Sequence, residues 1–228
     1  MVDTDPFRVL ASELDRIDTY VYAEHGKDPL EPIIGMGDRR CRLAIMGRDP
    51  GRHEVEYGEP FIGAGGQIVR RALFDAMHPE DDAVFDFPAS RAVGAHVFWA
   101  NTVPYKPIGN KAWGVRCKRR FYPLMADVLL DGWDGSDLIA LGRDAVMWFG
   151  LTDKPQLARL KAFWEQEDRY RTHVDVTLTG TAGQSRDIRV HPVPHPSPLN
   201  ATWYRQVPDI LASRLRDLEW GPDSWRLP

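Results

Sequence analysis

The stretch Gly47–Gly66, which reads GRDPGRHEVEYGEPFIGAGG, decides the fold that we expect for this chain. It follows Leu43–Met46, an apolar run with the length and composition of a buried strand. Residues 67–73 come next and read as the start of a helix. The pattern therefore places a long, glycine-rich loop at the carboxyl end of a strand, which is where open α/β sheets bind ligands.

One carboxylate in this loop stands directly before a proline, as Asp49–Pro50. The proline ring fixes its own φ and biases the preceding residue towards an extended conformation. The pair could therefore hold the carboxylate of Asp49 rigidly where the strand ends. A surface loop built from turn residues is the other explanation, and the loop composition does not decide between the two.

The composition indicates one folded α/β domain that spans residues 1–228. Of the 228 residues, 43% are hydrophobic and 27% are charged, which is enough to bury a full core. The net charge is −4, so a nucleic-acid partner would need a local basic patch. No apolar run is long enough to cross a membrane, and the first residues show no signal-peptide pattern. We expect a cytoplasmic monomer that does not bind membranes.

The rest of the chain reads as strands that alternate with helices. Strands are expected at residues 41–46, 96–100, 137–142, 171–180 and 186–193, with the last two joined as a hairpin. Helices are expected at residues 6–23, 65–77, 115–131, 143–150, 155–168 and 201–219, and residues 78–95 read as an irregular connection. This alternation predicts one domain with a mostly parallel sheet.

Three polar residues follow predicted strands where each strand ends: Asp49, Asn101 and His195. Because the carboxyl ends of parallel strands lie on one edge of a sheet, these side chains can share one pocket. Each of them alone also fits an ordinary turn, cap or loop position. The three together are more specific, and they predict a functional pocket at that edge.

Five short segments resemble the motifs of one enzyme superfamily. They are GRDPG at residues 47–51, GEPFIGAGG at 58–66, WANTV at 99–103, ALGR at 140–143 and HPSPL at 195–199. In order and spacing they resemble the motifs of the uracil-DNA glycosylase superfamily, over roughly residues 41–205. The first is similar to GQDPY of the family-1 enzymes and to GEAPG of the iron–sulfur family. The second is similar to GxPFVGxAG of the iron–sulfur family, and the last to the HPSPL loop of family 1.

The resemblance implies a three-layer α/β/α sandwich with a central, mostly parallel four-stranded sheet. It implies that Asp49 and His195 are catalytic, with Asp49 on the sugar face and His195 donating to uracil O2. Asn101 would read the uracil edge, and Phe61 would stack on the flipped base. Uracil-containing DNA would be the partner, single- or double-stranded. The remaining substrate-binding positions that it implies are Gly47, Arg48, Pro50 and Gly51.

The resemblance also implies contacts to DNA outside the base pocket. Leu199 would fill the gap that the flipped base leaves, as apolar wedges do in other DNA-kinking proteins. Backbone and hydroxyl groups of the two loops would bind flanking phosphates, namely those of Gly65, Gly66, Ser197 and Pro198. The basic patch that the negative net charge calls for is expected at Lys106, Lys111, Arg116 and residues 118–120.

The chain departs from both families that it resembles. Cys41 and Cys117 are too few for the four cysteines of the iron–sulfur cluster, so we expect no cofactor and no metal. Gly51 stands where family 1 has a tyrosine whose ring blocks the methyl group of thymine. The resemblance therefore implies a pocket that accepts 5-substituted uracils. The alternative is that Tyr57, Tyr105 or a neighbouring aromatic residue closes this wall.

Two other functions fit parts of the pattern. A metal hydrolase would use Asp49, His53, His191 and His195 as ligands, residue types that suit zinc, although no HxH or HExxH spacing is present. A damaged-DNA binding module would keep the pocket without turnover. Within the enzyme class, a glycosylase for another deaminated or 5-substituted base is the alternative to one for uracil.

Overall fold

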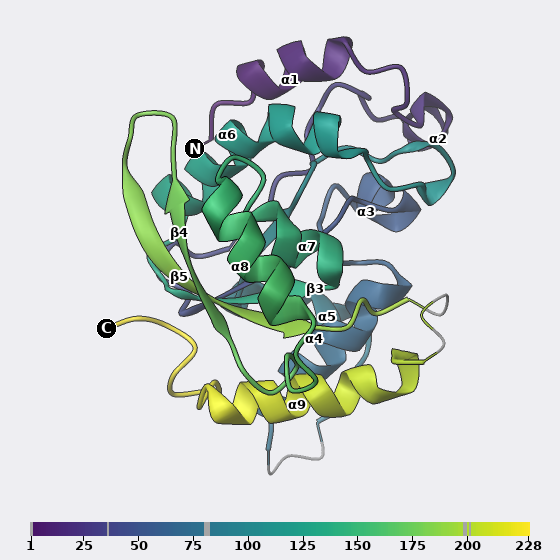
Figure 1. Ribbon diagram of the computed structural model, residues 1–228. Coiled ribbons are helices and arrows are strands. Elements are labelled where there is room, and N and C mark those ends of the chain that lie inside the picture. The colour runs from purple at the N-terminus through teal and green to yellow at the C-terminus, as the bar shows by residue number, and fades with distance from the viewer. Residues whose placement is uncertain (1, 36, 80–82, 198–199, 201) are drawn as a thin grey trace.

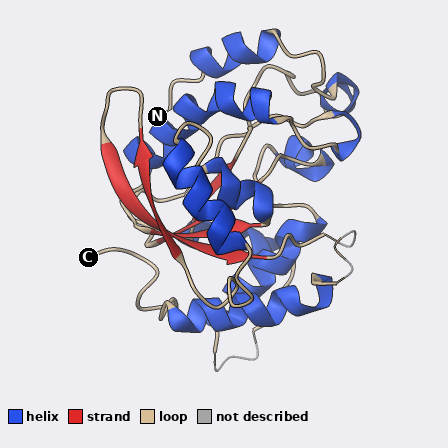
Figure 2. Ribbon diagram, in the orientation of Figure 1, coloured by secondary structure: helices blue, strands red, loops and turns tan. Residues whose placement is uncertain are grey.

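The computed structural model describes residues 2–35, 37–79, 83–197, 200 and 202–228. One five-stranded sheet forms its centre, in the strand order β2-β1-β3-β5-β4 (Figures 1 and 2). Four strands are parallel: β1 (Leu43–Gly47), β2 (Phe98–Asn101), β3 (Asp137–Leu141) and β5 (Ser185–Val193). At one edge β4 (Val174–Thr179) pairs antiparallel with β5, as the predicted hairpin requires. The α/β fold class is confirmed, with the five strands that the sequence pattern predicted and one more than the family resemblance implied.

Helices cover both faces of this sheet and complete the predicted three-layer sandwich (Figure 1). One layer contains α1 (Asp5–Ser12), α2 (Thr19–Glu24), α6 (Val115–Gly132), α7 (Arg143–Trp148) and α8 (Lys154–Trp164). The other contains α4 (Ala64–Met77), α5 (Phe87–Val93) and α9 (Val207–Asp217). Among the described residues, no helix has the length and apolar character needed to cross a membrane.

Strand β1 shows how the sequence builds a core on each side of the sheet. All five of its residues are buried. Leu43 and Ile45 pack in the cluster with α4 and α9, whereas Ala44 and Met46 pack in the cluster with α6 and α7. Successive side chains of a strand point to opposite faces, so a strand covered on both faces is apolar throughout. The continuous apolar run Leu43–Met46 therefore predicted strand β1 correctly.

The expected helix over residues 6–23 is wrong, because the chain forms two helices there, α1 and α2. Between them the backbone pairs with a distant loop. Ile17 forms a β-bridge with Pro107, and the amide of Asp18 donates to the carbonyl of Lys106 at 3.0 Å. These long-range pairings override the helical spacing of the apolar residues.

Two further helices occupy segments that were expected to be irregular. Within residues 78–95, α5 begins with Pro88 in its first turn, and the Asp86 carboxylate accepts from the Ala89 amide at 2.8 Å. Within the glycine-rich loop, α3 (Arg52–Tyr57) forms one short helix. The final helix starts at Val207, later than expected. Short 3₁₀ turns complete the described elements, at Gly94–His96, Ile108–Asn110 and Tyr204–Gln206.

A buried arginine on α4 fixes the segment that precedes this helix. The side chain of Arg70 is fully buried and makes four hydrogen bonds. Its donors reach the carbonyls of Phe61 (2.7 Å), Ser90 (2.8 Å) and Pro60 (2.9 Å), and Oε1 of Glu59 (2.8 Å). Because buried polar groups must be paired, the guanidinium and these acceptors satisfy one another.

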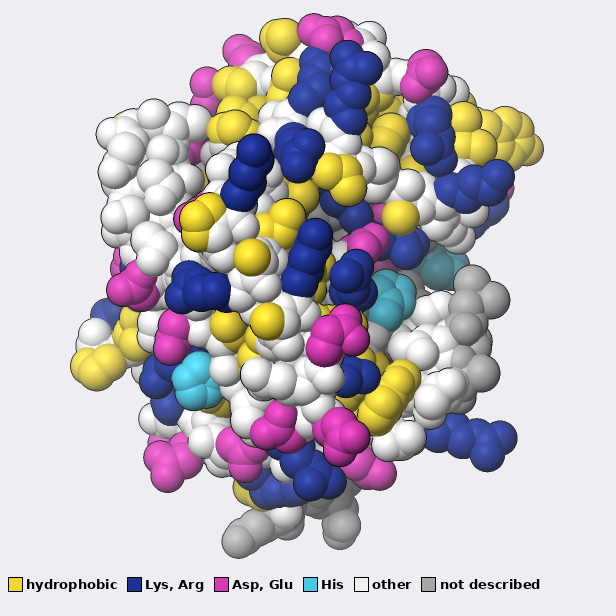
Figure 3. Space-filling model, viewed as in Figure 1, with side chains coloured by type: hydrophobic (Ala, Val, Ile, Leu, Met, Phe, Trp, Pro, Cys, Tyr) yellow, Lys and Arg dark blue, Asp and Glu magenta, His cyan; other side chains and the backbone are white. Residues whose placement is uncertain are grey.

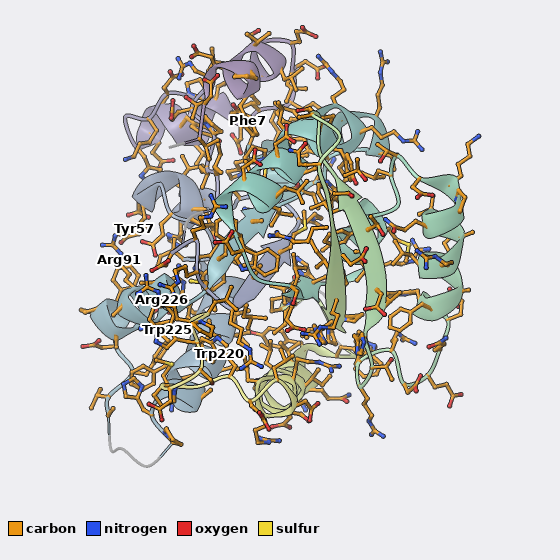
Figure 4. All side chains as sticks on the ribbon, turned by 90° about the vertical axis from the view of Figure 1, so that its left-hand side faces the viewer. Phe7, Tyr57, Arg91, Trp220, Trp225 and Arg226 are labelled. Carbon is orange, nitrogen blue, oxygen red and sulfur yellow. The ribbon has the colours of Figure 1, made fainter. Side chains whose placement is uncertain are left out.

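A second arginine, which lies at the surface, also binds Glu59. Arg91 of α5, labelled in Figure 4, donates to Oε2 of Glu59 at 2.8 Å, so both oxygens of Glu59 are held. Phe61 has a φ of +57°, a conformation that L-residues seldom adopt. Such backbone strain persists only where the surroundings hold it, which Arg70 does here.

We predict that Arg70→Met lowers the free energy of unfolding by about 3–5 kcal/mol, because removing one partner of a buried ion pair leaves the others unpaired. Chemical denaturation followed by fluorescence would measure the change. Arg71→Met is the matched control, since the Arg71 side chain on the same helix is 57% exposed and, among the described residues, forms an ion pair with Asp75 alone. A loss for Arg70→Met no larger than for the control would contradict the assignment.

Candidate active site

A cavity of about 340 Å³ opens at the carboxyl ends of β1, β2 and β3. It brings together most of the predicted site residues. From the sequence-based set, its lining contains Gly47, Arg48, Asp49, Pro50, Gly51, Phe61, Gly65, Gly66, Asn101 and His195. The first motif and the HPSPL loop, far apart in the sequence, therefore meet in one cavity.

Close packing around Gly47 forms one wall of this cavity. Gly47 of β1 pairs with Asn101 of β2. A Cβ atom on Gly47 would come within 2.5 Å of the Phe61 ring and 3.1 Å of Oδ1 of Asn101. The Phe61 ring in turn stacks on Trp99, with ring centroids 4.8 Å apart. Glycine at this position lets an aromatic ring and an amide approach each other beside the strand end.

Asn101 presents its side-chain amide to the cavity. The residue is buried, yet its amide forms no hydrogen bond with any described residue. An amide offers a donor and an acceptor side by side. It can therefore read a ligand edge that carries an acceptor next to a donor.

Asp49 lies at the end of β1 with its side chain only 2% exposed. Its Oδ2 accepts from Nε of Arg48 at 3.0 Å, whereas its Oδ1 is buried without a partner among the described residues. Burial raises the pKa of Asp49 to about 6, although the charges of Arg48 and Lys118 and the nearby backbone amide of Trp113 act to lower this pKa. Oδ1 of Asp49 can thus accept a hydrogen bond from a ligand or a water in a poorly solvated part of the site.

His195 lies across the same cavity, close to the turn that follows β3. A Cβ on Gly142, whose φ is +87°, would come within 2.9 Å of Cβ of His195. Burial lowers the pKa of His195 to about 4, and the positive charge of Arg48 contributes to the lowering. The imidazole is therefore neutral at pH 7, with one ring N–H to donate.

A model of the uracil DNA glycosylase superfamily matches residues 34–219, which include every element around this cavity. The chain belongs to the uracil-DNA glycosylase superfamily. A type-4 uracil-DNA glycosylase of Pyrobaculum aerophilum is 42% identical over 41 residues, or 18% of this chain and 21% of that relative. The chain thus matches about a fifth of the length of this curated relative.

This member of the superfamily does not fit the iron–sulfur cluster of its iron–sulfur relatives. Cys41 and Cys117 are the only cysteines in the sequence, whereas such a cluster needs four thiolates. Burial also raises the pKa of both thiols, to about 11 for Cys41 and about 12 for Cys117. Both thiols are therefore protonated at neutral pH.

Glu54 links the end of the first motif to the second motif, a role that sequence reasoning missed. Its Oε2 accepts from the Gly51 amide and its Oε1 from the Gly63 amide, each at 2.9 Å. The first bond is the glutamate half of a capping box at the start of α3, since glycine has no side chain to make the other half. A glycine followed three residues later by a glutamate was the available signal.

The two glycines in the first turn of α4 are sites of close approach between segments. A Cβ on Gly65 would lie 2.6 Å from the carbonyl oxygen of Pro196, and one on Gly66 would lie 2.0 Å from that of Phe61. Glycine here lets the HPSPL loop and the Phe61 segment pack onto the helix. Their predicted contacts with phosphate stay a prediction.

The expected basic patch needs correction. Lys106 is buried, and its ammonium binds Asp18 at 2.7 Å, so it does not contact a phosphate. Lys118 is buried and paired with Asp144 at 2.8 Å. Lys111 and Arg116 are exposed and have no partner among the described residues. Figure 3 shows Lys and Arg side chains around α6 and α8, on the face of the molecule viewed there.

The structure describes the HPSPL loop only in part. The amide of Ser197 donates to the carbonyl of His195 at 2.8 Å, which makes a tight turn after the histidine. Pro198 and Leu199 lie outside the described residues. Their predicted roles in DNA binding stay predictions from the sequence.

Three residues of the alternative metal site, Asp49, His53 and His195, line the cavity, but the fourth, His191, does not. His191 is buried and its Nε2 bonds to Oδ1 of Asp137 at 2.9 Å, whereas His53 pairs with Glu56 at 2.9 Å. Within the described ranges, no group of three or more His, Cys, Asp and Glu side chains is placed to hold a metal ion.

We predict that the imidazole of His195 titrates with a midpoint of about 4. The pH dependence of its ring signals in NMR spectra would measure this, with His195→Gln to identify them. Because the pKa is lower in the folded state, protonation of His195 opposes folding as the pH falls from about 6.5 towards 4. A midpoint at or above 6.5 would show that the ring is solvated and able to charge.

Proposed function

We propose that this protein is a DNA glycosylase that removes uracil from DNA by hydrolysing its N-glycosidic bond, leaving an abasic site. One observation carries the proposal. A buried carboxylate with an unpartnered oxygen, a neutral imidazole and an unpaired amide line the same cavity, all among the described residues. Membership of the superfamily supports the class of reaction, and the partial match to a type-4 enzyme supports uracil as the base.

The chemistry needs charge stabilisation on both sides of the breaking bond. The sugar becomes oxocarbenium-like while the departing base gains negative charge. Asp49 supplies the negative charge on the sugar side, through its unpartnered Oδ1 or through a water that this oxygen polarises. A neutral His195 donates a hydrogen bond to uracil O2 as the base becomes an anion, without itself bringing a full charge.

Recognition of the base falls to the groups around Gly47. The Asn101 NH₂ donates to uracil O4, and its carbonyl accepts from N3–H. Cytosine presents the reverse pattern, and each unpaired buried polar group costs about 1–3 kcal/mol, so cytosine is rejected. Phe61, supported by Trp99, stacks on the base. A damaged-DNA binding module would need the recognition groups but not an unpartnered carboxylate oxygen.

The base has to leave the duplex before it can enter the cavity, which costs a few kcal/mol. We propose that Leu199 fills the vacated space, and that Gly65, Gly66, Ser197, Pro198 and Lys111 contact the flanking backbone. Residues 1–228 act in this proposal as one monomeric domain.

We predict that Asp49→Asn lowers the single-turnover rate of base release by about 10³-fold or more, with DNA binding within a few-fold, since the loss falls on the transition state. The assay incubates labelled oligonucleotides that hold one U, hypoxanthine, xanthine or T, and cleaves abasic sites with alkali. Asp75→Asn is the matched control, because the exposed Arg71 is its one ion-pair partner in the described part of the chain. An Asp49→Asn variant as fast as the original protein would refute the role of Asp49.

The same assay separates the alternatives. The proposal expects full activity in EDTA, whereas a metal hydrolase would lose its activity. Tight binding to uracil-containing DNA without release of any base would favour the binding module.

We predict that the protein accepts 5-substituted uracils. Gly51 stands where family 1 has a tyrosine whose ring blocks substituents at C5 of uracil. Without that ring, a small apolar substituent changes the free energy of transition-state binding by only about 1–3 kcal/mol. Single-turnover assays would show release of both U and 5-hydroxymethyluracil, and Gly51→Tyr would lose activity only on the bulkier base.

The structure makes one control necessary for this experiment. A Cβ on Gly51 would lie 2.7 Å from Oε2 of Glu54, so any side chain there disturbs the link that Glu54 makes. Gly51→Ala introduces that disturbance without a ring. If the original protein rejects every 5-substituted base, another residue closes the wall and Gly51 does not set the specificity.

A further inference from the structure

Arg48 is an unusual residue to find beside a buried carboxylate that has to act on a sugar. In the two motifs that this loop resembles, the corresponding residue is glutamine or glutamate. Arg48 lines the cavity, and its Nε donates to Oδ2 of Asp49 at 3.0 Å. Its Nη2 donates to the carbonyl of Asn110, in the loop between β2 and α6, at 3.2 Å.

We propose that Arg48 is a positioning residue that holds one oxygen of Asp49 and leaves the other available in the cavity. The inference rests on the proposed glycosylase function and deepens it. With Oδ2 held by Nε, the carboxylate cannot rotate without breaking a charge-assisted hydrogen bond. The oxygen left without a partner among the described residues is Oδ1, which is the one available to the sugar or to a water.

The backbone around Asn110 makes the anchor for Arg48 rigid. Gly109 and Asn110 both have left-handed φ values, +62° and +55°, and together they turn the chain so that the Asn110 carbonyl meets the guanidinium. Arg48 thus spans the space between the first motif and a second loop. Its guanidinium is fixed at both ends, which is what a positioning role needs.

The charges around Asp49 come from several elements. From its own loop it faces Arg48, and from α6 it faces Lys118, whose ammonium is already bound to Asp144. Cys117 on α6 is also near, as a thiol with a raised pKa, and His195 lies across the cavity as a neutral ring. Arg48 is therefore the one cation in contact with the carboxylate among the described residues.

The charge of Arg48 acts on both groups of the site in the same direction. It favours the ionised form of Asp49 and disfavours the protonated form of His195, so it lowers the pKa of each. The state that the reaction needs is an ionised aspartate with a neutral histidine. Without Arg48 both pKa values rise, and this state becomes rarer at acid pH.

The decisive variants are Arg48→Gln, which keeps a donor but removes the charge, and Arg48→Lys, which keeps the charge. The first readout uses the free protein: the carboxyl carbon of Asp49 is followed by NMR against pH. We expect its midpoint to rise by about one unit or more in Arg48→Gln, since a contacting opposite charge lowers a carboxyl pKa by about 1–3 units. In Arg48→Lys the midpoint should stay nearer to that of the original protein.

The second readout is the single-turnover rate on uracil-containing oligonucleotides. For a one-unit shift from a pKa of about 6, loss of ionised Asp49 slows Arg48→Gln by about eightfold at pH 5.5 and hardly at all at pH 8. A residue that only tied two loops together would slow the reaction equally at both pH values. Arg71→Gln, at an exposed ion pair outside this cavity, is the matched control and should change neither readout.

Each result decides the matter. An unmoved Asp49 midpoint, an equal loss of rate at pH 5.5 and pH 8, or weakened DNA binding with an unmoved midpoint would overturn the proposal. A raised midpoint with an acid-specific loss supports it. If the original protein released no base from any oligonucleotide, the proposed function would fail, while the titration would still decide whether Arg48 controls Asp49.

Discussion

The geometry of the cavity depends on the buried guanidinium of Arg70. It binds the backbone carbonyls of Pro60 and Phe61 and one oxygen of Glu59, and so holds Phe61 in a left-handed conformation. That conformation directs the ring against Trp99 and beside Gly47. Without such a clamp the backbone strain would relax, and the aromatic wall of the cavity would be lost.

Close packing also explains why the first two motifs are rich in glycine. At Gly47, Gly65 and Gly66 a Cβ atom would collide with a ring or a backbone carbonyl. These glycines bring the strand end, the Phe61 segment and the HPSPL loop to distances that side chains would prevent. Close approach then buries Asp49 and His195, and burial raises the pKa of the first and lowers the pKa of the second.

Periodicity and motif order predicted most of the architecture. The buried strands, the hairpin and α6 were found because their apolar patterns are local and strong. The prediction of one helix over residues 6–23 was wrong, because the local apolar pattern does not show the pairing of Ile17 with Pro107. The role of Arg70 was also missed, although a basic residue on the same helical face as Leu73 and Phe74 was a signal that it is buried.

By itself, the sequence determined which chemical groups this protein has and near which strand ends they stand: a carboxylate, an amide and an imidazole in the order of a known superfamily. Only the tertiary structure decided how these groups are charged and which cations remain for a partner. Lys106 and Lys118 read as surface charges, yet both ammonium groups are buried against aspartates from other elements. The reason is physical: the state of a charged group depends on its burial and on its nearest partners, and residues distant in sequence supply both.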